Sequence, residues 1–395
     1  MSYPVLKLKI GREKSIARKH PWVFSGALCE PLPKLPDGAV VYVADYHGKV
    51  LGTGHFHRGS IAVRLFAFAQ VVPDAAFWQQ KLARSIAYRK SLGFGADVQT
   101  NCYRLVHGEG DGLSGLIVDM YDQVVVLQCH SIGMHRVRHE LAAGIRAALG
   151  QSVCVFDKSK AALPPHYAAG VQDGWLLGQG SHSVVVREHG HHFEVHIAEG
   201  QKTGFFLDQR DNRAFVASFA QGKTVLNAFC YSGGFSIYAL ARGAQWVDSV
   251  DASAKAIEWT QRNVQLNALP TERHATHVAD VMQFLKMQPT GKYDLMVIDP
   301  PAFAKRIDKR HKAVQAYKRL NALALKQIAP GGILCTFSCS QVIDLQLFKD
   351  TIVAAGIEAG RQVRLFATLT QPADHPVNLF HPEGSYLKGL ALFVS

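Results

Sequence analysis

Two short segments of the sequence carry residues that could perform covalent chemistry on a heterocyclic base. Cys339 directly follows a strand pattern at residues 332–337, and Asp299, Pro300 and Pro301 follow another at residues 295–298. A thiolate can attack carbon 6 of a pyrimidine, which makes carbon 5 nucleophilic toward a sulfonium methyl group. The two prolines remove amide donors and leave carbonyl groups to accept hydrogen bonds from an amino-heterocycle. A lone cysteine is more often structural, but at this strand end we interpret Cys339 as a nucleophile.

A glycine turn between two further strand patterns predicts a nucleotide-like ligand. Residues 225–228 read as a strand, Gly233 and Gly234 form the turn before a helix pattern at 237–242, and Asp251 ends the next strand. The glycines allow close backbone approach, and Asp251 is placed to accept hydrogen bonds from ribose hydroxyls. The dinucleotide fingerprint Gly-x-Gly-x-x-Gly is absent, so a carboxylate-bearing nucleoside such as S-adenosylmethionine fits better than a pyrophosphate. The alternative is an ordinary strand–turn–helix packing unit.

Other residues are expected to line the same ligand. Residues 201–213 combine an aromatic-glycine step with polar side chains, which we interpret as a lip over a bound cofactor; the alternative is a loop with acids that cap the next helix. Asp280 follows the third strand, where it could bind the adenine amino group. The predicted cofactor-binding residues are Phe206, Gln209, Arg210, Asn227, Tyr231, Ser232, Gly233, Gly234, Asp251, Asp280 and Asp299.

The elements that must position these residues alternate regularly from residue 224 to the end. The expected strands are 225–228, 246–250, 274–278, 295–298 and 332–337, with a closing pair near 361–369 and 386–393. The expected helices lie near 235–242, 254–267, 281–287, 317–328 and 346–355. This alternation predicts an α/β fold with a Rossmann-like parallel sheet covered on both faces, and the closing pair could form an antiparallel edge.

The first half of the chain predicts two smaller domains. Residues 1–72 read as a β-rich module with strands near 5–10, 39–44, 50–55 and 62–68 and a basic helix at 12–20. Trp22 and Phe24 follow that helix and could stack on RNA bases, but we interpret them as core. Residues 73–182 read as an α+β domain with helices at 74–92 and 134–149, a hairpin turn at 121–123 and a loop from 158 to 180. Glu109 and Asp111, in a glycine-rich loop, are interpreted as structural.

Composition narrows the class of partner. The formal charge of +12 and the clustering of basic residues favour a polyanion such as nucleic acid. The predicted RNA-binding residues are Arg12, Lys14, Arg18, Lys19, Lys305 and Lys318. The seven cysteines include no Cys-x-x-Cys, and His189, His191 and His192 are interpreted as a polar hairpin face, so no metal site is expected. No apolar run is long enough to span a membrane, and no signal peptide is evident, which favours a cytoplasmic protein.

A series of motifs runs through the chain in order. They are Gly11-Arg12-Glu13-Lys14-Ser15, His20-Pro21-Trp22-Val23-Phe24-Ser25-Gly26, Gly108-Glu109-x-Asp111-Gly112-Leu113-x-Gly115, Lys202-Thr203-Gly204-x-Phe206-Leu207-Asp208-Gln209-Arg210, Ser232-Gly233-Gly234-Phe235, Asp299-Pro300-Pro301, Phe337-Ser338-Cys339-Ser340, Asp374-His375-Pro376 and Pro382-Glu383-Gly384-x-Tyr386-Leu387-Lys388-Gly389. Through these motifs the chain resembles, over nearly its full length, the ribosomal RNA large subunit methyltransferase I family, the PUA-containing 5-methylcytosine methyltransferases.

The resemblance implies a PUA RNA-binding domain at 1–72, a middle domain at 73–182 and a class I methyltransferase domain at 183–395. It implies S-adenosylmethionine as methyl donor and one cytosine of large-subunit ribosomal RNA as target. Cys339 would be the nucleophile, and Asp299 would hydrogen-bond the cytosine ring edge and help to protonate ring nitrogen 3. A homodimer is possible.

One departure from other cytosine-5 methyltransferase families leaves a step open. Those families carry a second cysteine after the proline of the fourth motif, where this chain has Pro301 and Ala302. The base that removes the carbon 5 proton is therefore open between His375, Glu383 and a water held by Asp299. His375 is better interpreted as a hydrogen-bond partner of its neighbour Asp374.

Three other functions remain as alternatives. The turn at Asp299 would also suit methylation of an exocyclic base nitrogen, which needs no thiol. A non-catalytic RNA-binding or ribosome assembly factor could keep the same fold. A Rossmann dehydrogenase is disfavoured because its fingerprint is missing.

Overall fold

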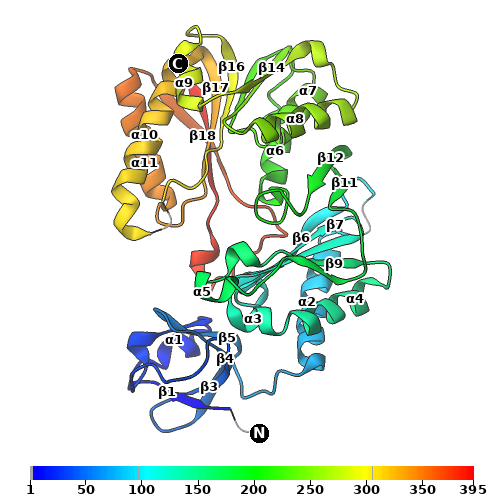
Figure 1. Ribbon diagram of the computed structural model, residues 1–395. Coiled ribbons are helices and arrows are strands. Elements are labelled where there is room, and N and C mark those ends of the chain that lie inside the picture. Colours follow the sequence, from blue (N-terminus) through cyan, green and yellow to red (C-terminus); the bar gives the residue numbers. More distant parts are fainter. Residues whose placement is uncertain (1–2, 96–97, 305) are drawn as a thin grey trace. The chain divides into compact units, whose positions relative to one another are not determined.

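The computed structural model describes residues 3–95, 98–304 and 306–395 (Figure 1). The chain forms two compact units, each assembled from segments distant in sequence. The first unit comprises residues 1–187, 195–205 and 373–384, and the second comprises 188–194, 206–372 and 385–395. The segments predicted as β-rich and middle domains both lie in the first unit, and the three domain boundaries stay a prediction.

The first unit begins with a five-stranded sheet of order β1-β3-β4-β5-β2. Its strands are β1 (Val5–Lys7), β2 (Trp22–Phe24), β3 (Val40–Ala44), β4 (Val50–Phe56) and β5 (Ile61–Ala67). The basic helix is shorter than expected, because α1 covers only Lys14–Ala17. The assignment of Trp22 and Phe24 to the core is wrong for Phe24, which is 47% exposed, and Trp22 is only half-buried. Side chains alternate along a strand, so Val23 takes the buried position of β2 instead.

A second sheet of order β10-β9-β8-β7-β6 follows in the same unit. Its strands are β6 (Cys102–His107), β7 (Leu116–Tyr121), β8 (Val124–Cys129), β9 (Cys154–Asp157) and β10 (Gly174–Leu177). Helix α2 (Ala75–Ser91) packs beside α4 (Arg138–Leu149). The expected turn at 121–123 is confirmed, and Asp122 adopts the left-handed conformation (φ 57°).

Two expectations for this region are wrong. The single helix expected at 134–149 is divided into α3 (Ile132–Arg136), which Ser131 caps, and α4. The loop expected at 158–180 contains α5 (Pro165–Ala168) and strand β10, which pairs with β9. Pairing with a neighbouring strand, which local sequence does not encode, decides the second case.

A hairpin lies where the chain passes from the first unit to the second. Strands β11 (Ser183–Glu188) and β12 (His191–His196) are joined by His189 and Gly190, which have positive φ angles of 49° and 81°. Two successive residues with positive φ are typical of tight hairpin turns, and the hairpin expected about Gly190 is confirmed.

The second unit is built on a seven-stranded sheet of order β15-β14-β13-β16-β17-β19-β18. The strands are β13 (Thr224–Ala228), β14 (Trp246–Asp251), β15 (His274–Val278), β16 (Tyr293–Ile298), β17 (Ile328–Ser338), β18 (Val363–Leu369) and β19 (Lys388–Val394). The first five pair in parallel, and β19 pairs antiparallel with both β17 and β18. The expected parallel sheet with an antiparallel closing pair is confirmed.

Helices cover both faces of this sheet (Figure 1). Apolar side chains of α9 (Val281–Met287), α10 (Arg310–Gln327) and α11 (Leu345–Ala359) share one buried core with Leu226 and Ala228 of β13. The remaining helices are α6 (Arg210–Ala217), α7 (Gly234–Ala241) and α8 (Ala254–Leu266). Helix α10 begins seven residues before the expected position, so the basic residues from Arg310 to Arg319 are helical. No helix of the described part of the chain is long and apolar enough to cross a membrane.

Candidate active site

The strand order creates one point where ligands of such sheets bind. From β13 the chain builds outward through β14 and β15, then returns to place β16 on the other side of β13. Ligands of open α/β sheets bind at this reversal, outside the carboxyl ends of the strands. In the second unit, Ala228, Asp251, Ile298 and Ser338 are the last residues of β13, β14, β16 and β17.

Asp299 and Cys339 leave this edge from adjacent strands. In the parallel ladder Ile298 of β16 pairs with Thr336 of β17. Asp299 therefore lies level with Phe337, and Cys339 follows two residues beyond it. Neighbouring strands are about 4.8 Å apart, so the acid and the thiol belong to one edge of the sheet. Both residues are half-buried.

The loop after β13 has an unusual backbone. Phe229 and Tyr231 have positive φ angles of 62° and 48°, and Gly233 follows at 81°. A Cβ at Gly233 would lie 2.6 Å from Cγ2 of Thr260, so this turn accepts only glycine without rearrangement. Thr260 also donates a hydrogen bond from Oγ1 to the Tyr231 carbonyl (2.8 Å). Strained backbone held by its surroundings is common at ligand sites.

Several features of this loop fit a nucleoside ligand. Ser232 is 4% exposed, and its hydroxyl has no hydrogen-bond partner in the described part of the chain. Helix α7 begins directly after Gly233 and presents its first amide groups at the same turn. An orphaned hydroxyl beside free helix amides is a donor set that a bound polar ligand would satisfy.

The two predicted ribose and adenine ligands also hold backbone. Asp251 accepts hydrogen bonds from the amides of Tyr231 (3.0 Å) and Ser253 (2.9 Å), so it joins the end of β14 to the loop after β13. Asp280 caps α9 by accepting from the Gln283 amide (3.0 Å) and is exposed. A carboxylate has about four acceptor positions, so each retains acceptor capacity for a ligand.

The segment before α6 contacts this edge directly. The Phe206 ring meets the Tyr231 ring edge-on, with centroids 5.0 Å apart. Gln209 donates from Nε2 to Oδ2 of Asp299 (2.9 Å), and its own Oε1 accepts from Asn212 (2.6 Å). The structure thus brings together the predicted residues of the lip and of the Asp299 turn.

Two of the predicted cofactor-binding residues, Arg210 and Asn227, are almost completely buried. Arg210 is 1% exposed. Asn227 is also 1% exposed, and its amide donates to Oγ of Ser236 (2.8 Å), which bonds in turn with Ser249 (2.7 Å). Asn227 therefore belongs to a polar network between β13, α7 and β14, and its role toward a cofactor stays a prediction.

A buried ion pair that the sequence analysis did not predict packs against the glycine turn. Arg213 of α6 and Glu188 form a two-point ion pair, with both N–O distances at 2.8 Å and side-chain exposures of 3% and 0%. Tyr238 adds a hydrogen bond from Oη to Glu188 (3.0 Å). A Cβ at Gly234 would lie 2.8 Å from Cδ of Arg213, so this pair also explains the second glycine. No local motif identifies such a pair, because its members lie in different elements.

Cys339 has a buried cation beside it. Lys388, at the start of β19, is 6% exposed and donates from Nζ to the carbonyls of Ser340 and Tyr386 (both 2.7 Å). Burial lowers the pKa of Lys388 to about 8, while attraction to Cys339 and Asp344 acts in the opposite direction. A cation at this position stabilises a thiolate. Lys388 lies in the Tyr386-Leu387-Lys388-Gly389 motif, which is the only local signal that could have identified it.

Tyr317 of α10 contacts both the segment after β16 and the segment after β17. Its hydroxyl lies 3.2 Å from Oγ of Ser340, and its ring packs against Phe303 with centroids 4.6 Å apart. Burial raises the pKa of Tyr317, and a charge on Cys339 raises it further. The ring of Phe303 is 37% exposed, as a base-stacking residue would require.

Comparison with known proteins identifies the family. Residues 136–376 match a family model described as S-adenosylmethionine-dependent methyltransferase, and residues 6–68 match a PUA-like domain. The chain is 37% identical over 384 residues to ribosomal RNA large subunit methyltransferase I of Pseudoalteromonas atlantica, covering 96% of each chain. It is 36% identical over 395 residues to the protein of that name from Salmonella arizonae, covering 99% of this chain and 97% of the other. This chain belongs to the ribosomal RNA large subunit methyltransferase I family.

Two solved structures share the fold of this chain. A SAM-dependent methyltransferase from Streptococcus mutans is 24% identical, with a TM-score of 0.85 over 99% of this chain and 100% of that chain. A second, the methyltransferase SMU.776 in complex with SAH, has a TM-score of 0.85 over the whole of both chains at 23% identity. The expected PUA-like and class I methyltransferase folds are confirmed, and S-adenosylmethionine is the cofactor of this family member.

The predicted RNA-binding residues of the methyltransferase I chain fall into two groups. Arg12, Lys14, Arg18 and Lys19 are all exposed around α1 in the first unit. Arg18 lines a pocket of about 480 Å³ with Ser15, His20, Phe24, Leu379 and Phe380. Lys305 lies outside the described residues. Lys318, on α10, forms an ion pair with Glu358 (2.8 Å).

Glu109, Asp111, Asp374 and His375 each make side-chain contacts within the first unit. Asp111 forms a buried ion pair with Arg89, and Glu109 accepts from Nε1 of Trp22 (2.8 Å). The interpretation of both acids as structural agrees with these contacts. Nδ1 of His375 lies 3.1 Å from Oδ1 of Asp374, as the hydrogen-bonded pair requires, and both side chains are fully buried.

Proposed function

We propose that this protein transfers a methyl group from S-adenosylmethionine to carbon 5 of a cytosine in large-subunit ribosomal RNA, with Cys339 as the covalent nucleophile. The observation that carries this proposal is the position of Asp299 and Cys339 just beyond the ends of adjacent strands, with the Lys388 ammonium hydrogen-bonded to the carbonyl of Ser340, the residue next to the thiol. The names of the two relatives, ribosomal RNA large subunit methyltransferase I, support ribosomal RNA as the substrate.

Each residue has a role in the proposed step. Cys339, as the thiolate that Lys388 stabilises, attacks carbon 6 of the ring, and Asp299 supplies the proton that ring nitrogen 3 gains. The bound cofactor provides an electrophilic sulfonium methyl group. Carbon 5 then takes the methyl and loses its proton to a base. The Cys339 thiolate leaves as the double bond between carbons 5 and 6 re-forms, and ring nitrogen 3 returns its proton to Asp299. The identity of that base stays open.

The target nucleotide must leave its base stack to reach Cys339. We therefore expect unpaired or flipped RNA as substrate. The exposed basic residues around α1 suit RNA phosphates, and the exposed Phe24 ring suits stacking on an unpaired base.

A second candidate is methylation of an exocyclic base nitrogen. The observation that favours it is the Asp299-Pro300-Pro301 turn followed by the exposed Phe303, an arrangement that can hold an amino group without any thiol. The two chemistries differ in their need for Cys339, because only the carbon 5 route passes through a covalent adduct.

The experiment is methyl transfer from labelled S-adenosylmethionine to unmodified large-subunit ribosomal RNA, followed by digestion to nucleosides. We expect 5-methylcytidine from the wild type and from Cys29→Ser, a control at an exposed cysteine, and none from Cys339→Ala. Cofactor affinity of Cys339→Ala should match the wild type. A methylated exocyclic nitrogen, or 5-methylcytidine from Cys339→Ala, would reject the proposed mechanism. If naked RNA is inert, partly assembled subunits are the next substrate, and failure there too favours an assembly factor.

A further inference from the structure

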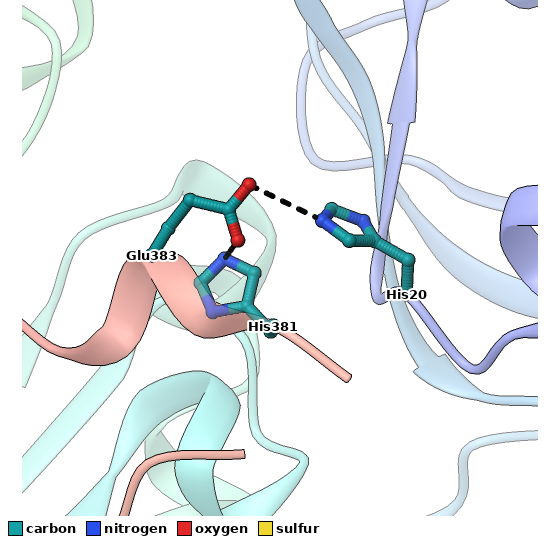
Figure 2. Close-up of side chains that lie close together, drawn as sticks. All are labelled: His20, His381 and Glu383. Carbon is teal, nitrogen blue, oxygen red and sulfur yellow. Dashed lines mark ion pairs between the residues drawn. The ribbon is translucent and has the colours of Figure 1, made fainter. Parts of the chain in front are cut away.

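Three side chains that can bind metal meet in the first unit although the chain separates two of them from the third by more than 350 residues (Figure 2). His20 precedes β2, and His381 and Glu383 lie at a short 3-10 helix, Pro382–Gly384. Oxygens of Glu383 lie 3.5 Å from Nε2 of His20 and 3.7 Å from Nε2 of His381. One ligand atom from each residue lies within 4.8 Å of the other two.

The ring of His381 gives the strongest reason to expect an additional ligand here. His381 is 3% exposed, and neither of its ring nitrogens has a hydrogen-bond partner in the described part of the chain. The 3.7 Å between Nε2 and Glu383 exceeds a hydrogen-bond length. Leaving a buried polar group unpaired costs about 1–3 kcal/mol. A cation between the three residues would remove this cost.

The spacing of the donor atoms agrees with a tetrahedral ion. Zinc lies about 2.0–2.2 Å from imidazole nitrogen and carboxylate oxygen. Two ligands of a tetrahedral ion are then roughly 3.4 Å apart. Oε1 of Glu383 lies 3.5 Å from Nε2 of His20, and Oε2 lies 3.7 Å from Nε2 of His381, so each of these two distances needs only a small contraction to reach this value. Figure 2 shows that both Nε2 atoms face the Glu383 carboxylate.

The surroundings of His20 can fix the ring for metal binding. Its Nδ1 lies 3.3 Å from the Trp22 carbonyl and 3.2 Å from the Trp22 amide nitrogen, so Nδ1 can donate to the first or accept from the second. The tautomer that donates from Nδ1 leaves Nε2 as a ligand. Ligating histidines usually donate their other ring N–H in this way. Trp22 itself is held by its indole hydrogen bond to Glu109 (2.8 Å), and its ring packs against His381 with centroids 4.3 Å apart.

We propose that His20, His381 and Glu383 form a Zn²⁺ site with one water or other exchangeable ligand in the fourth position. Two imidazoles and one carboxylate are ligands that zinc accepts, and the Glu383 side chain, 47% exposed, leaves that position open to solvent. Through these ligands the ion would tie residues 373–384 to the start of the β-rich sheet. No redox or covalent step is involved, and measuring zinc binding does not depend on methyl transfer.

The test is direct zinc binding to the untagged, full-length protein after chelator treatment. Zinc alone is titrated in competition with a chromophoric chelator. We expect one tight site in the wild type and in His47→Asn, a control at an exposed histidine of the same unit. His381→Asn and Glu383→Gln should each weaken binding by at least about tenfold, since each removes one of three protein ligands.

Two further readouts separate loss of a ligand from loss of the fold. Glu383→Gln changes one exposed atom and should keep the wild-type circular dichroism spectrum. Zinc should raise the unfolding temperature of the wild type and of His47→Asn, and much less that of Glu383→Gln. Cobalt substituted at the site should give the visible absorption of a tetrahedral ion in the wild type. A wild type without a tight zinc site, or variants that bind zinc as the wild type does, would overturn the proposal.

Discussion

Gln209 donates a hydrogen bond from Nε2 to Oδ2 of Asp299 over 2.9 Å. The bond connects the segment before α6 to the turn after β16, and both residues were predicted from the sequence to face the cofactor. Gln209 is 3% exposed, so Asn212 and Asp299 constrain its amide on both sides. The orientation of Asp299, on which the proposed protonation of the base depends, therefore rests on Gln209.

Replacing Gln209 by Glu should slow methyl transfer about 10- to 100-fold, which corresponds to about 1.4–2.8 kcal/mol in the activation free energy. The new carboxylate would face Asp299 without a donor and repel it. The measurement is single-turnover transfer to RNA with saturating cofactor. Gln265→Glu, at an exposed position of α8, serves as control. An unchanged single-turnover rate in Gln209→Glu would contradict the proposed role of Asp299 in protonating the base.

The reactivity of Cys339 should depend on pH through Lys388. The pKa of Lys388 is lowered to about 8, so its ammonium is present below pH 8 and is lost as the pH rises through 8. Lys388→Met should therefore slow alkylation of Cys339 by about tenfold at pH 7, and the difference from wild type should shrink above pH 9. Mass spectrometry of the Cys339 peptide measures the rate apart from the exposed Cys29. A ratio that is constant with pH would contradict this role.

Gly233→Ala should weaken binding of S-adenosylmethionine by about tenfold or more and destabilise the protein by roughly 1–3 kcal/mol. The residue has a φ of +81°, and an added Cβ would meet Thr260 at 2.6 Å. Calorimetry measures the affinity, and urea unfolding measures the stability. Gly331→Ala also changes a glycine of positive φ (78°) but meets no neighbouring atom within 4 Å. It should lose stability while keeping cofactor affinity, and equal affinity losses in both variants would count against the site.

Removing the charge of Glu188 should destabilise the second unit by about 3–5 kcal/mol, because Arg213 would remain buried without its counter-ion. Glu188→Gln tests this by urea denaturation, with Glu258→Gln on the exposed side of α8 expected within about 0.5 kcal/mol of wild type. Cofactor affinity should fall as well, since Arg213 packs beneath Gly234. A loss below about 1 kcal/mol would show that the pair contributes little.

Arg18→Ala should weaken binding of ribosomal RNA and lower the slope of log affinity against log salt by about 1, as expected for loss of one phosphate contact. The residue is exposed beside the pocket that Phe24 and Phe380 line. Lys49→Ala, an exposed control on the turn between β3 and β4, should leave both quantities unchanged. If the slope of log affinity against log salt is the same for Arg18→Ala and wild type, Arg18 does not contact an RNA phosphate.

The sequence alone was sufficient for the C-terminal sheet and for most of the proposed site. Strand, turn and acid follow one another within a few residues at Gly233, Asp251, Asp299 and Cys339, and the α/β pattern requires that strand ends share an edge. These are local signals combined with one topological rule, so they can be read without coordinates. The local pattern failed for Phe24, where alternation along β2 exposes the ring.

Only the tertiary structure revealed the interactions between residues far apart in sequence. The pairs of Glu188 with Arg213 and of Gln209 with Asp299, the position of Lys388 beside Cys339, and the meeting of His20 with His381 and Glu383 all join separate elements. Local spacing encodes the conformation of a segment, but a contact between distant segments depends on how the whole chain packs. The dispersed histidines predicted no metal site for this reason, and folding places two of them beside one carboxylate.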